Sequence, residues 1–337
     1  MKLFVTGGAG FIGANFVHYM LNKHPQLRIV NVDKLTYAGN LENLSELESD
    51  PRHVFFRLDI CDSRAMEELL AEELPDAVVN FAAESHVDRS ITGPEVFVRT
   101  NVMGTLSLLE AARKAGVAVF LQISTDEVYG SLGEEGFFTE SRTLQPNSPY
   151  AASKAGADHL VRAYHRTHGM DTRITRCSNN YDPYQFPKKL IPLMLTNAME
   201  GKELPVYGDG LHVRDWIYVL DHCRALELVL EKGHAGDIYN VGGVAQMTNL
   251  DTVRTILDVI DADHSLIRFV EDRPGHDRRY AIDSSKLQTE LGWKPTVDFP
   301  TGIAETIKWY RAHQDWWQNI KSGEYRQYYE KMYGNRL

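Results

Sequence analysis

The stretch KLFVTGGAGFIG, residues 2–13, decides the fold class. Its first five residues predict a buried strand, and the glycines at positions 7, 10 and 13 stand where a tight turn would enter a helix. Glycine lets the backbone approach a pyrophosphate, whose charge is favoured by the free N–H groups of a helix start. A glycine pattern alone is also typical of an ordinary turn. Here the strand before it and the helix after it favour a dinucleotide site.

Acidic and small residues follow the next expected strands. Asp33 comes about 20 residues after Gly13, where a carboxylate binds the adenosine ribose and repels a 2′-phosphate, so it favours NAD over NADP. Asp59 and Ile60 follow the third expected strand and could contact adenine, whereas residues 81–83 follow the fourth and allow a close approach. Each would be ordinary alone, but ligands of open α/β sheets bind at these carboxyl ends of strands.

Strand and helix patterns alternate through the first half of the chain. Strands are expected at 2–6, 28–32, 54–58, 77–81, 117–124 and 173–177. Helices are expected at 11–22, 63–72, 96–115 and 149–168. This alternation predicts an α/β fold, a Rossmann-type doubly wound parallel sheet with helices on both faces. A smaller α/β lobe should bind the substrate.

The alternation of strand and helix patterns ends after residue 177. Residues 179–192 and 201–215 are rich in turn-forming residues, which indicates either ordered loops around a ligand or irregular connections between lobes. The segment 216–241 again resembles a helix followed by a strand. We therefore expect residues 1–178 with roughly 216–242 to form the NAD-binding Rossmann domain, and roughly 179–215 with 243–337 to form the second lobe.

Composition narrows the classes of function. The 337 residues include 46 acidic and 36 basic side chains, a net charge of −10 that argues against nucleic acid or an anionic membrane as partner. Cys61, Cys177 and Cys223 are widely spaced and suggest neither a disulfide framework nor a zinc site, so we expect no metal and a cytoplasmic protein. No targeting or membrane-spanning segment is indicated.

Five residues offer the reactive groups. Tyr150 and Lys154 lie at i and i+4 of an expected helix, a spacing that is common on solvated helix faces and gains meaning beside an NAD motif. A nearby lysine charge and an oxidised nicotinamide would make the Tyr150 phenol, whose ordinary pKa is about 10, a usable base. Thr125, Asp126 and Glu127 follow a strand. An alcohol dehydrogenase needs the hydroxyl but no extra acid and base, so the two carboxylates indicate a second chemical step.

Six stretches together resemble the dTDP-glucose 4,6-dehydratase family of the extended short-chain dehydrogenase/reductase superfamily, and the similarity spans essentially the whole chain. They are GGAGFIG (7–13), FAAESHVDRS (81–90), STDEVYG (124–130), YAASK (150–154), RCSNNY (176–181) and DRPGHDRRY (272–280). The Thr-Asp-Glu triplet and the Arg-Pro-Gly-His-Asp segment are the more discriminating pieces. The glycine loop and the Tyr/Lys pair are shared by the wider superfamily.

The resemblance implies a reaction in three stages. Tyr150 removes the C4 hydroxyl proton as NAD⁺ oxidises C4, Thr125 hydrogen-bonds that oxygen, and Lys154 binds the nicotinamide ribose and lowers the Tyr150 pKa. Glu127 then removes the C5 proton while Asp126 protonates the departing C6 hydroxyl. Reduction at C6 completes a 4-keto-6-deoxy sugar and regenerates NAD⁺.

The resemblance also implies binding residues and a partner. NAD contacts are expected at Gly7, Gly10, Phe11, Ile12, Gly13, Asp33, Lys34, Leu35, Thr36, Asp59, Ile60, Phe81, Ala82, Ala83, Ser85, Thr100, Tyr150, Lys154 and Asn180. Contacts to the nucleotide sugar, dTDP-glucose, are expected at Ser85, His86, Thr125, Asn179, Lys189, Leu190, Tyr207, Arg214, Asn249, Arg273 and His276. The two arginines suit phosphate, although buried ion pairing would use them equally well. A homodimer is expected through the helices that begin near Val96 and Pro149.

Two positions depart from the family pattern, and they keep alternatives open. Asp182 stands where the family usually has Gly, and Lys188 where it has Glu, so nucleotide preference is left open. An NAD-dependent nucleotide-sugar 4-epimerase would share the glycine loop, Thr, Tyr and Lys but would not need the two carboxylates. A non-catalytic nucleotide-sugar or NAD-binding module is the other alternative, against which the intact Thr125, Tyr150 and Lys154 speak.

Overall fold

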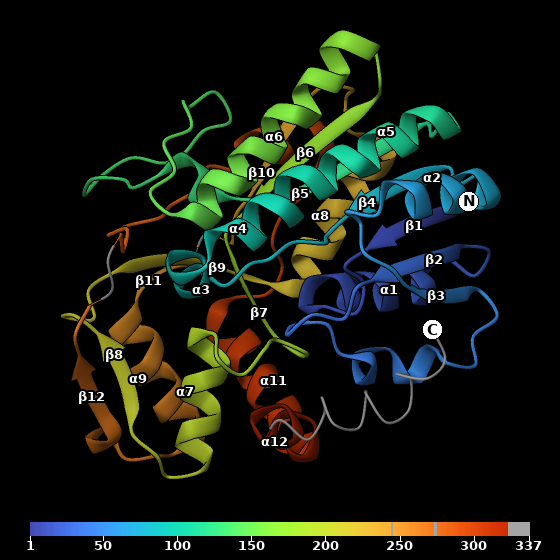
Figure 1. Ribbon diagram of the computed structural model, residues 1–337. Coiled ribbons are helices and arrows are strands. Elements are labelled where there is room, and N and C mark those ends of the chain that lie inside the picture. The colour runs from blue at the N-terminus through green and yellow to red at the C-terminus, as the bar shows by residue number, and fades with distance from the viewer. Residues whose placement is uncertain (244, 273–274, 323–337) are drawn as a thin grey trace.

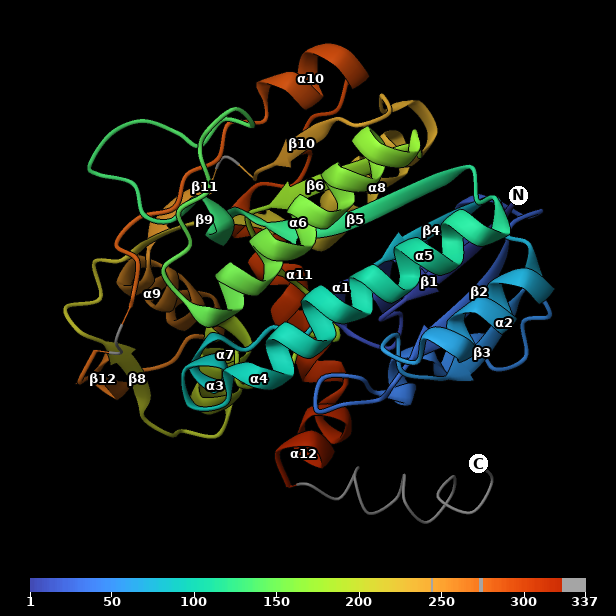
Figure 2. The same ribbon diagram turned by 45° about the horizontal axis from the view of Figure 1, so that its top comes forward.

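The computed structural model describes residues 1–243, 245–272 and 275–322. Within these ranges a seven-stranded parallel sheet has the order β10-β6-β5-β4-β1-β2-β3, with helices on both faces (Figures 1 and 2). Its strands are β1 (Lys2–Thr6), β2 (Arg28–Asp33), β3 (His53–Arg57), β4 (Ala77–Asn80), β5 (Val119–Thr125), β6 (Thr172–Cys177) and β10 (Ile238–Val241). The predicted Rossmann-type sheet is confirmed.

Both faces of this sheet are buried, which explains its nearly continuous apolar strands. Leu3 and Val5 of β1 pack in one hydrophobic cluster with α1 and α8, whereas Phe4 packs in another with α2, α5 and α6. These helices are α1 (Phe11–Lys23), α2 (Ser63–Glu73), α5 (Thr105–Ala115), α6 (Pro149–His168) and α8 (Val219–Lys232). Successive side chains of a strand thus pack against helices on opposite faces of the sheet.

The helix expected at 96–115 is interrupted. It consists of α4 (Pro94–Phe97), a π-helical segment η2 (Val98–Gly104) and α5. Within the π segment Asn101 bonds outside the helix: its Oδ1 accepts from the backbone N–H of Glu84 at 2.9 Å, and its Nδ2 donates to Ser153 Oγ at 2.8 Å. The irregular segment therefore ties the loop after β4 to helix α6.

The remaining elements form smaller sheets and a helical layer. Strands β7 (Asn179–Tyr181), β9 (Val213–Tyr218) and β11 (Ala245–Thr248) make a three-stranded sheet, and β8 (Leu204–Tyr207) pairs with β12 (Ile267–Val270). The longer helices are α7 (Leu190–Met199), α9 (Asn249–Ile260), α11 (Phe299–Ala312) and α12 (Gln314–Ser322). Shorter elements are η1 (Leu41–Leu47), α3 (Val87–Thr92), η3 (Asp126–Tyr129), η4 (His264–Leu266) and α10 (Ser285–Leu291).

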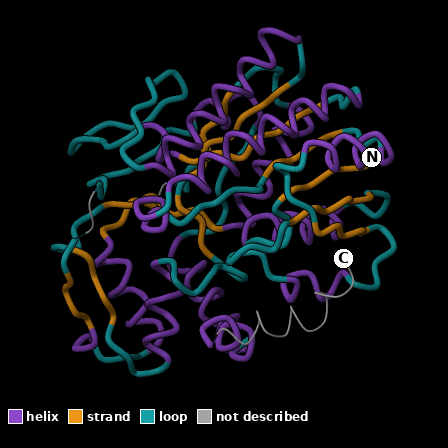
Figure 3. Tube along the Cα trace, viewed as in Figure 1, coloured by secondary structure: helices purple, strands orange, loops and turns teal. Residues whose placement is uncertain are grey.

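The turn-rich passages hold more regular structure than expected. Residues 179–192 contain β7 and the start of α7, and residues 201–215 contain β8 and the start of β9 (Figure 3). The helix expected from residue 216 begins at Val219, after β9, and the following strand β10 joins the large sheet beside β6. The division into two domains stays a prediction. Over the described residues, no helix combines the length and the apolar character needed to cross a membrane.

Candidate active site

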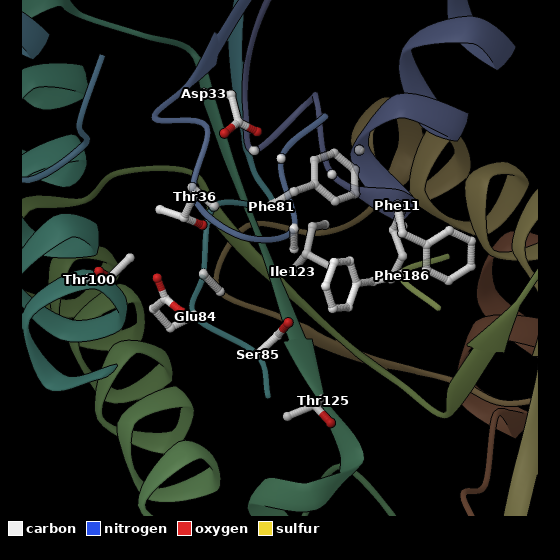
Figure 4. Close-up of a pocket in the computed structure, with 18 of the residues that line it drawn as sticks. Phe11, Asp33, Thr36, Phe81, Glu84, Ser85, Thr100, Ile123, Thr125 and Phe186 are labelled. Atoms are coloured by element: carbon white, nitrogen blue, oxygen red, sulfur yellow. The ribbon is translucent and has the colours of Figure 1, made fainter. Parts of the chain in front are cut away.

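One pocket runs along the carboxyl ends of the strands of the large sheet, from the glycine loop to helix α6 (Figure 4). The predicted NAD contacts that line it are Gly7, Gly10, Phe11, Ile12, Gly13, Asp33, Lys34, Thr36, Asp59, Ile60, Phe81, Ala82, Ala83, Ser85, Thr100, Tyr150, Lys154 and Asn180. Leu35 does not line it: its side chain packs against the core that includes α1. The structure therefore gathers nearly all of the predicted cofactor residues in one cavity.

The glycine loop is shaped for close backbone approach. Gly7 has a φ of 71°, and a Cβ there would lie 2.6 Å from the backbone nitrogen of Ala82. A Cβ on Gly13 would lie 2.3 Å from the Gly7 carbonyl oxygen. Helix α1 begins at Phe11 without a side-chain cap, and its first three residues line the pocket. This arrangement fits a pyrophosphate.

Asp33 fixes the turn beside this loop. Its Oδ2 accepts from Ala9 N at 3.1 Å and its Oδ1 from Leu35 N at 2.8 Å. Burial raises the pKa of Asp33, and these two hydrogen bonds oppose the rise. The carboxyl group thus holds the glycine loop to the end of β2, and the same residue lines the pocket.

Tyr150 and Lys154 lie one turn apart on α6 and are both buried. Burial, followed by the charge of Glu127, raises the Tyr150 pKa well above its ordinary value, whereas a hydrogen bond with Thr125 lowers it. Lys154 Nζ donates to the Ile123 carbonyl oxygen at 2.6 Å, and burial lowers the Lys154 pKa. Tyr150 is therefore a neutral phenol in the protein alone.

The two adjacent carboxyl groups have different surroundings. Glu127 lines the pocket, whereas Asp126 does not and is only 2% exposed. Burial, then the charges of Glu127 and Asp215, raises the Asp126 pKa well above its ordinary value. Thr125 Oγ1 donates to Asp126 Oδ1 at 3.3 Å, and Asp126 Oδ2 has no partner among the described residues. Burial therefore favours the protonated form of Asp126, the form that a general acid needs.

The predicted substrate contacts fall into two groups. Ser85, Thr125, Asn179 and Lys189 line the pocket, whereas His86, Leu190, Tyr207, Arg214, Asn249 and His276 lie outside its lining, and Arg273 lies outside the described residues. His86 precedes α3 and Leu190 opens α7.

Three of the outer residues gather around His212. Its ring stacks on that of His276 with centroids 3.7 Å apart, and the Tyr207 ring meets His276 edge-on at 6.2 Å. Asn249 N donates to the His212 carbonyl oxygen at 2.9 Å. Arg214, two residues later on β9, lies with Cζ 4.4 Å from the ring centroid of Tyr280. Sequence reasoning missed His212, which no motif marks.

Several pocket residues were not predicted. Tyr37 and Glu84 lie directly beside predicted positions. The expectation that ligands bind at the carboxyl ends of the strands could therefore have found them. Gln185 and Phe186 come from the turn-rich passage after β7, where no local pattern marks them. The other unpredicted lining residues are Val32, Ala38, Gly39, Leu58, Ile123, Ser124, Cys177 and Ser178.

The two departures from the family pattern lie in different surroundings. Asp182 is 2% exposed with a φ of 143°, and its Oδ1 accepts from Thr306 Oγ1 at 3.4 Å. Burial raises the pKa of Asp182 to about 8, against the lowering effect of hydrogen bonds with Tyr218 and Thr306. Lys188 is exposed. The acidic substitution is therefore an internal packing feature and the basic one a surface feature.

Comparison with known proteins shows which families and solved structures this chain is similar to. The family model described as GDP-mannose 4,6 dehydratase matches residues 4–306. A dTDP-glucose 4,6-dehydratase of Shigella flexneri is 51% identical, over 100% of this chain and 100% of its own. The solved structure of a Streptomyces venezuelae dTDP-glucose 4,6-dehydratase with NAD bound is 52% identical with a TM-score of 0.92, covering 95% of this chain and 100% of that one. A UDP-glucose 4-epimerase of Thermotoga maritima is more distant, at 30% identity and a TM-score of 0.87 over 93% and 100%.

Proposed function

This chain belongs to the GDP-mannose 4,6 dehydratase family and, within it, to the dTDP-glucose 4,6-dehydratases, and we propose that it dehydrates dTDP-glucose to dTDP-4-keto-6-deoxyglucose with a retained NAD. It is an NAD-using hydro-lyase of deoxysugar biosynthesis. The observation that carries the proposal is the pair formed by Asp126 and Glu127, one buried with a raised pKa and the other in the pocket.

NAD fits the pocket described above. Gly7, Gly10 and Gly13 would hold its pyrophosphate, Asp33 its adenosine ribose, and Lys154 its nicotinamide ribose. When bound, the cofactor takes two electrons from C4 of the sugar and later returns them to C6. The chain's own groups must therefore move protons and exclude water.

Tyr150 and Thr125 serve the oxidation step in this proposal. Thr125 hydrogen-bonds Tyr150, so both hydroxyl groups can meet one substrate oxygen. Burial makes the phenolate costly in the protein alone, so the positive charge of bound cofactor would favour its formation. Tyr150 then accepts the proton of the C4 hydroxyl.

Asp126 and Glu127 serve the elimination step. A ketone at C4 acidifies the C5 proton, which Glu127 can remove from its place in the pocket. Asp126, whose pKa burial raises, would donate the proton that the leaving C6 hydroxyl needs. Water leaves as the C5–C6 double bond forms, and Glu127 can return its proton to C5 during the final reduction.

The alternatives explain less of this site. A 4-epimerase has no use for a protonated acid beside a second carboxyl group, and the epimerase neighbour is the more distant one. A non-catalytic binding module would leave Thr125, Tyr150 and Lys154 without a purpose. Dehydration accounts for all five residues.

The substrate side and the assembly complete the proposal. Tyr207, Arg214, Asn249 and His276 would bind the nucleotide diphosphate from outside the cofactor pocket, in the lobe of residues 179–215 and 243–337. Exposed apolar side chains near α4 and η2, namely Ile91, Val96, Val98 and Met103, support a homodimer interface there. The free thiols of the three cysteines agree with a cytoplasmic location.

Incubation with NAD and dTDP-glucose tests the activity. We expect a 4-keto sugar, detected by its absorbance in alkali, and one water lost per sugar by mass spectrometry. A 4-epimer of unchanged mass would support the epimerase. Binding of sugar and NAD without conversion would support the non-catalytic module.

A further inference from the structure

Three separate segments of the chain meet around Tyr37, beside the cofactor pocket. They are the turn of residues 36–39, the segment 85–89 that includes the start of α3, and the segment 185–189 that leads into α7. Tyr37, Ser85, Phe186 and Lys189 all line the pocket, and Figure 4 shows Thr36, Ser85 and Phe186 around the same cavity. Contacts among these segments therefore lie at the wall of the cofactor pocket.

The Tyr37 side chain contacts both of the other segments. The guanidinium carbon of Arg89 lies 4.2 Å from its ring centroid, a cation–π geometry. The ring of Phe186 meets it at 5.4 Å and 81°, an edge-to-face pair. Its hydroxyl is 3.4 Å from Ser85 Oγ. The ring thus joins segments that are far apart in the sequence.

Hydrogen bonds hold each segment in place. Gly39 N donates to the Thr36 carbonyl oxygen at 3.2 Å, which closes the turn that carries Tyr37. Tyr310 Oη donates to the Gln185 carbonyl oxygen at 2.6 Å, directly before Phe186. Lys189 Nζ donates to the Ser85 carbonyl oxygen at 2.8 Å and so links the second and third segments. Tyr37 and Phe186 therefore meet from two segments that hydrogen bonds hold in place.

We propose that Tyr37, Arg89 and Phe186 form a latch that slows the dissociation of NAD, so that one cofactor molecule serves both the oxidation and the final reduction. This inference rests on the proposed function, because a reaction that first removes and then returns two electrons needs the cofactor to stay. In the latch Tyr37 is a positioning residue. It acts on cofactor retention and leaves the proton transfers to other groups.

The rate at which bound NAD exchanges with radiolabelled NAD, without sugar, measures how strongly the latch slows dissociation. Tyr37→Leu removes both ring contacts and should accelerate exchange about tenfold, since about 1.4 kcal/mol corresponds to a factor of ten. Arg89→Met removes the exposed cation and should accelerate it about two- to fivefold. Tyr37→Phe keeps the ring and should change the rate by less than about twofold. As a matched control, Arg142→Met removes a cation 5.1 Å from the Phe138 ring, away from the pocket, and should have no effect.

The same variants make failure of the latch distinct from failure of the proposed function. With dTDP-glucose added, Tyr37→Leu should release free NADH into the ultrafiltrate, whereas the wild type should not. Unchanged exchange in both Tyr37→Leu and Arg89→Met would overturn the latch, whatever the sugar chemistry. If Tyr37→Leu does not fold, Arg89→Met decides, because Arg89 is exposed. Faster exchange in a chain that fails to dehydrate the sugar would keep a cofactor latch and overturn the proposed function.

Discussion

The two ends of the pocket are lined by different kinds of group. At the glycine loop, Gly7, Gly13 and Ala82 leave room for close backbone approach, and recognition rests on shape and N–H groups. At helix α6, buried ionisable side chains have shifted pKa values, raised in Tyr150 and lowered in Lys154. Asp33 is the ionisable side chain that holds this loop, and two backbone hydrogen bonds oppose the rise of its pKa by burial. At the second end burial disfavours the charged forms of both groups, so it raises the pKa of Tyr150 and lowers that of Lys154.

Replacing Tyr150 by Phe should have the largest effect, since it removes the base from the reacting end only. Turnover should fall by about 10² to 10⁴, the range for loss of a positioned general base, while affinity for the nucleotide sugar changes little. Steady-state kinetics and calorimetric titration separate the two quantities. Tyr164→Phe, which removes a hydroxyl from the same helix on its Glu110 side, is the control and should keep native turnover. Native turnover in Tyr150→Phe would remove its assigned role.

Replacing Asp33 by Ala should act at the cofactor end only. Its carboxylate hydrogen bonds to Ala9 and Leu35 would be lost together with its ribose contact, so NAD affinity should fall about tenfold or more. Asp33→Asn keeps an acceptor and should lose less affinity, but it removes the charge that repels a 2′-phosphate. Fluorescence titration with NAD and NADP measures both effects. Equal affinity of the wild type for the two cofactors would contradict the NAD assignment.

Asp182 tests what burial does to a carboxyl group outside the pocket. The folded protein holds this proton to about pH 8, whereas the unfolded chain releases it near 3.8. The stabilisation is complete below the unfolded pKa and is lost as pH rises through the folded one. Asp182→Asn removes this titrating group. As the pH rises from 5 to about 8, the melting temperature of the wild type should therefore fall relative to that of the variant. Scanning calorimetry of the pair checks this.

A variant at the same position separates charge from backbone strain. Asp182→Gly also relieves the positive φ of 143°, a region that glycine adopts readily. It should follow the Asn variant in pH dependence, with a further gain at every pH. A wild-type difference that stays constant with pH would show that Asp182 does not titrate in this range.

The cofactor half of the fold was predictable because its signals are local. The run 2–6 and the glycines after it appear in the structure as β1, the turn and α1, with the first strand correct to the residue. Doubly buried parallel strands read as apolar runs, and helices follow β1, β3, β4 and β5 along the chain. Because ligands bind at the carboxyl ends of such strands, the sequence predicted Asp33 and residues 81–83 beside a ligand, and the structure has them in the pocket lining.

The substrate side was less predictable because its order comes from distant pairing. Strand β8 pairs with β12, more than sixty residues later, and β7 pairs with β9 rather than with a neighbour in sequence. Short strands of this kind carry no periodic pattern, so turn residues dominate their sequence. The same cause hid Phe186, which reaches the pocket through tertiary structure. Burial differences such as that between Asp126 and Glu127 also need the folded chain.

The measurement that tests the separation of the two steps most directly follows the Glu127→Gln variant with NAD and dTDP-glucose in deuterium oxide. In the proposed mechanism Tyr150 and Thr125 serve oxidation at C4, whereas Glu127 removes the C5 proton. We therefore expect enzyme-bound NADH to accumulate while deuterium fails to enter C5, with the wild type incorporating deuterium as control. Exchange at C5 at the wild-type rate in the variant would show that Glu127 is not the base, and the division of labour between oxidation and elimination would be wrong.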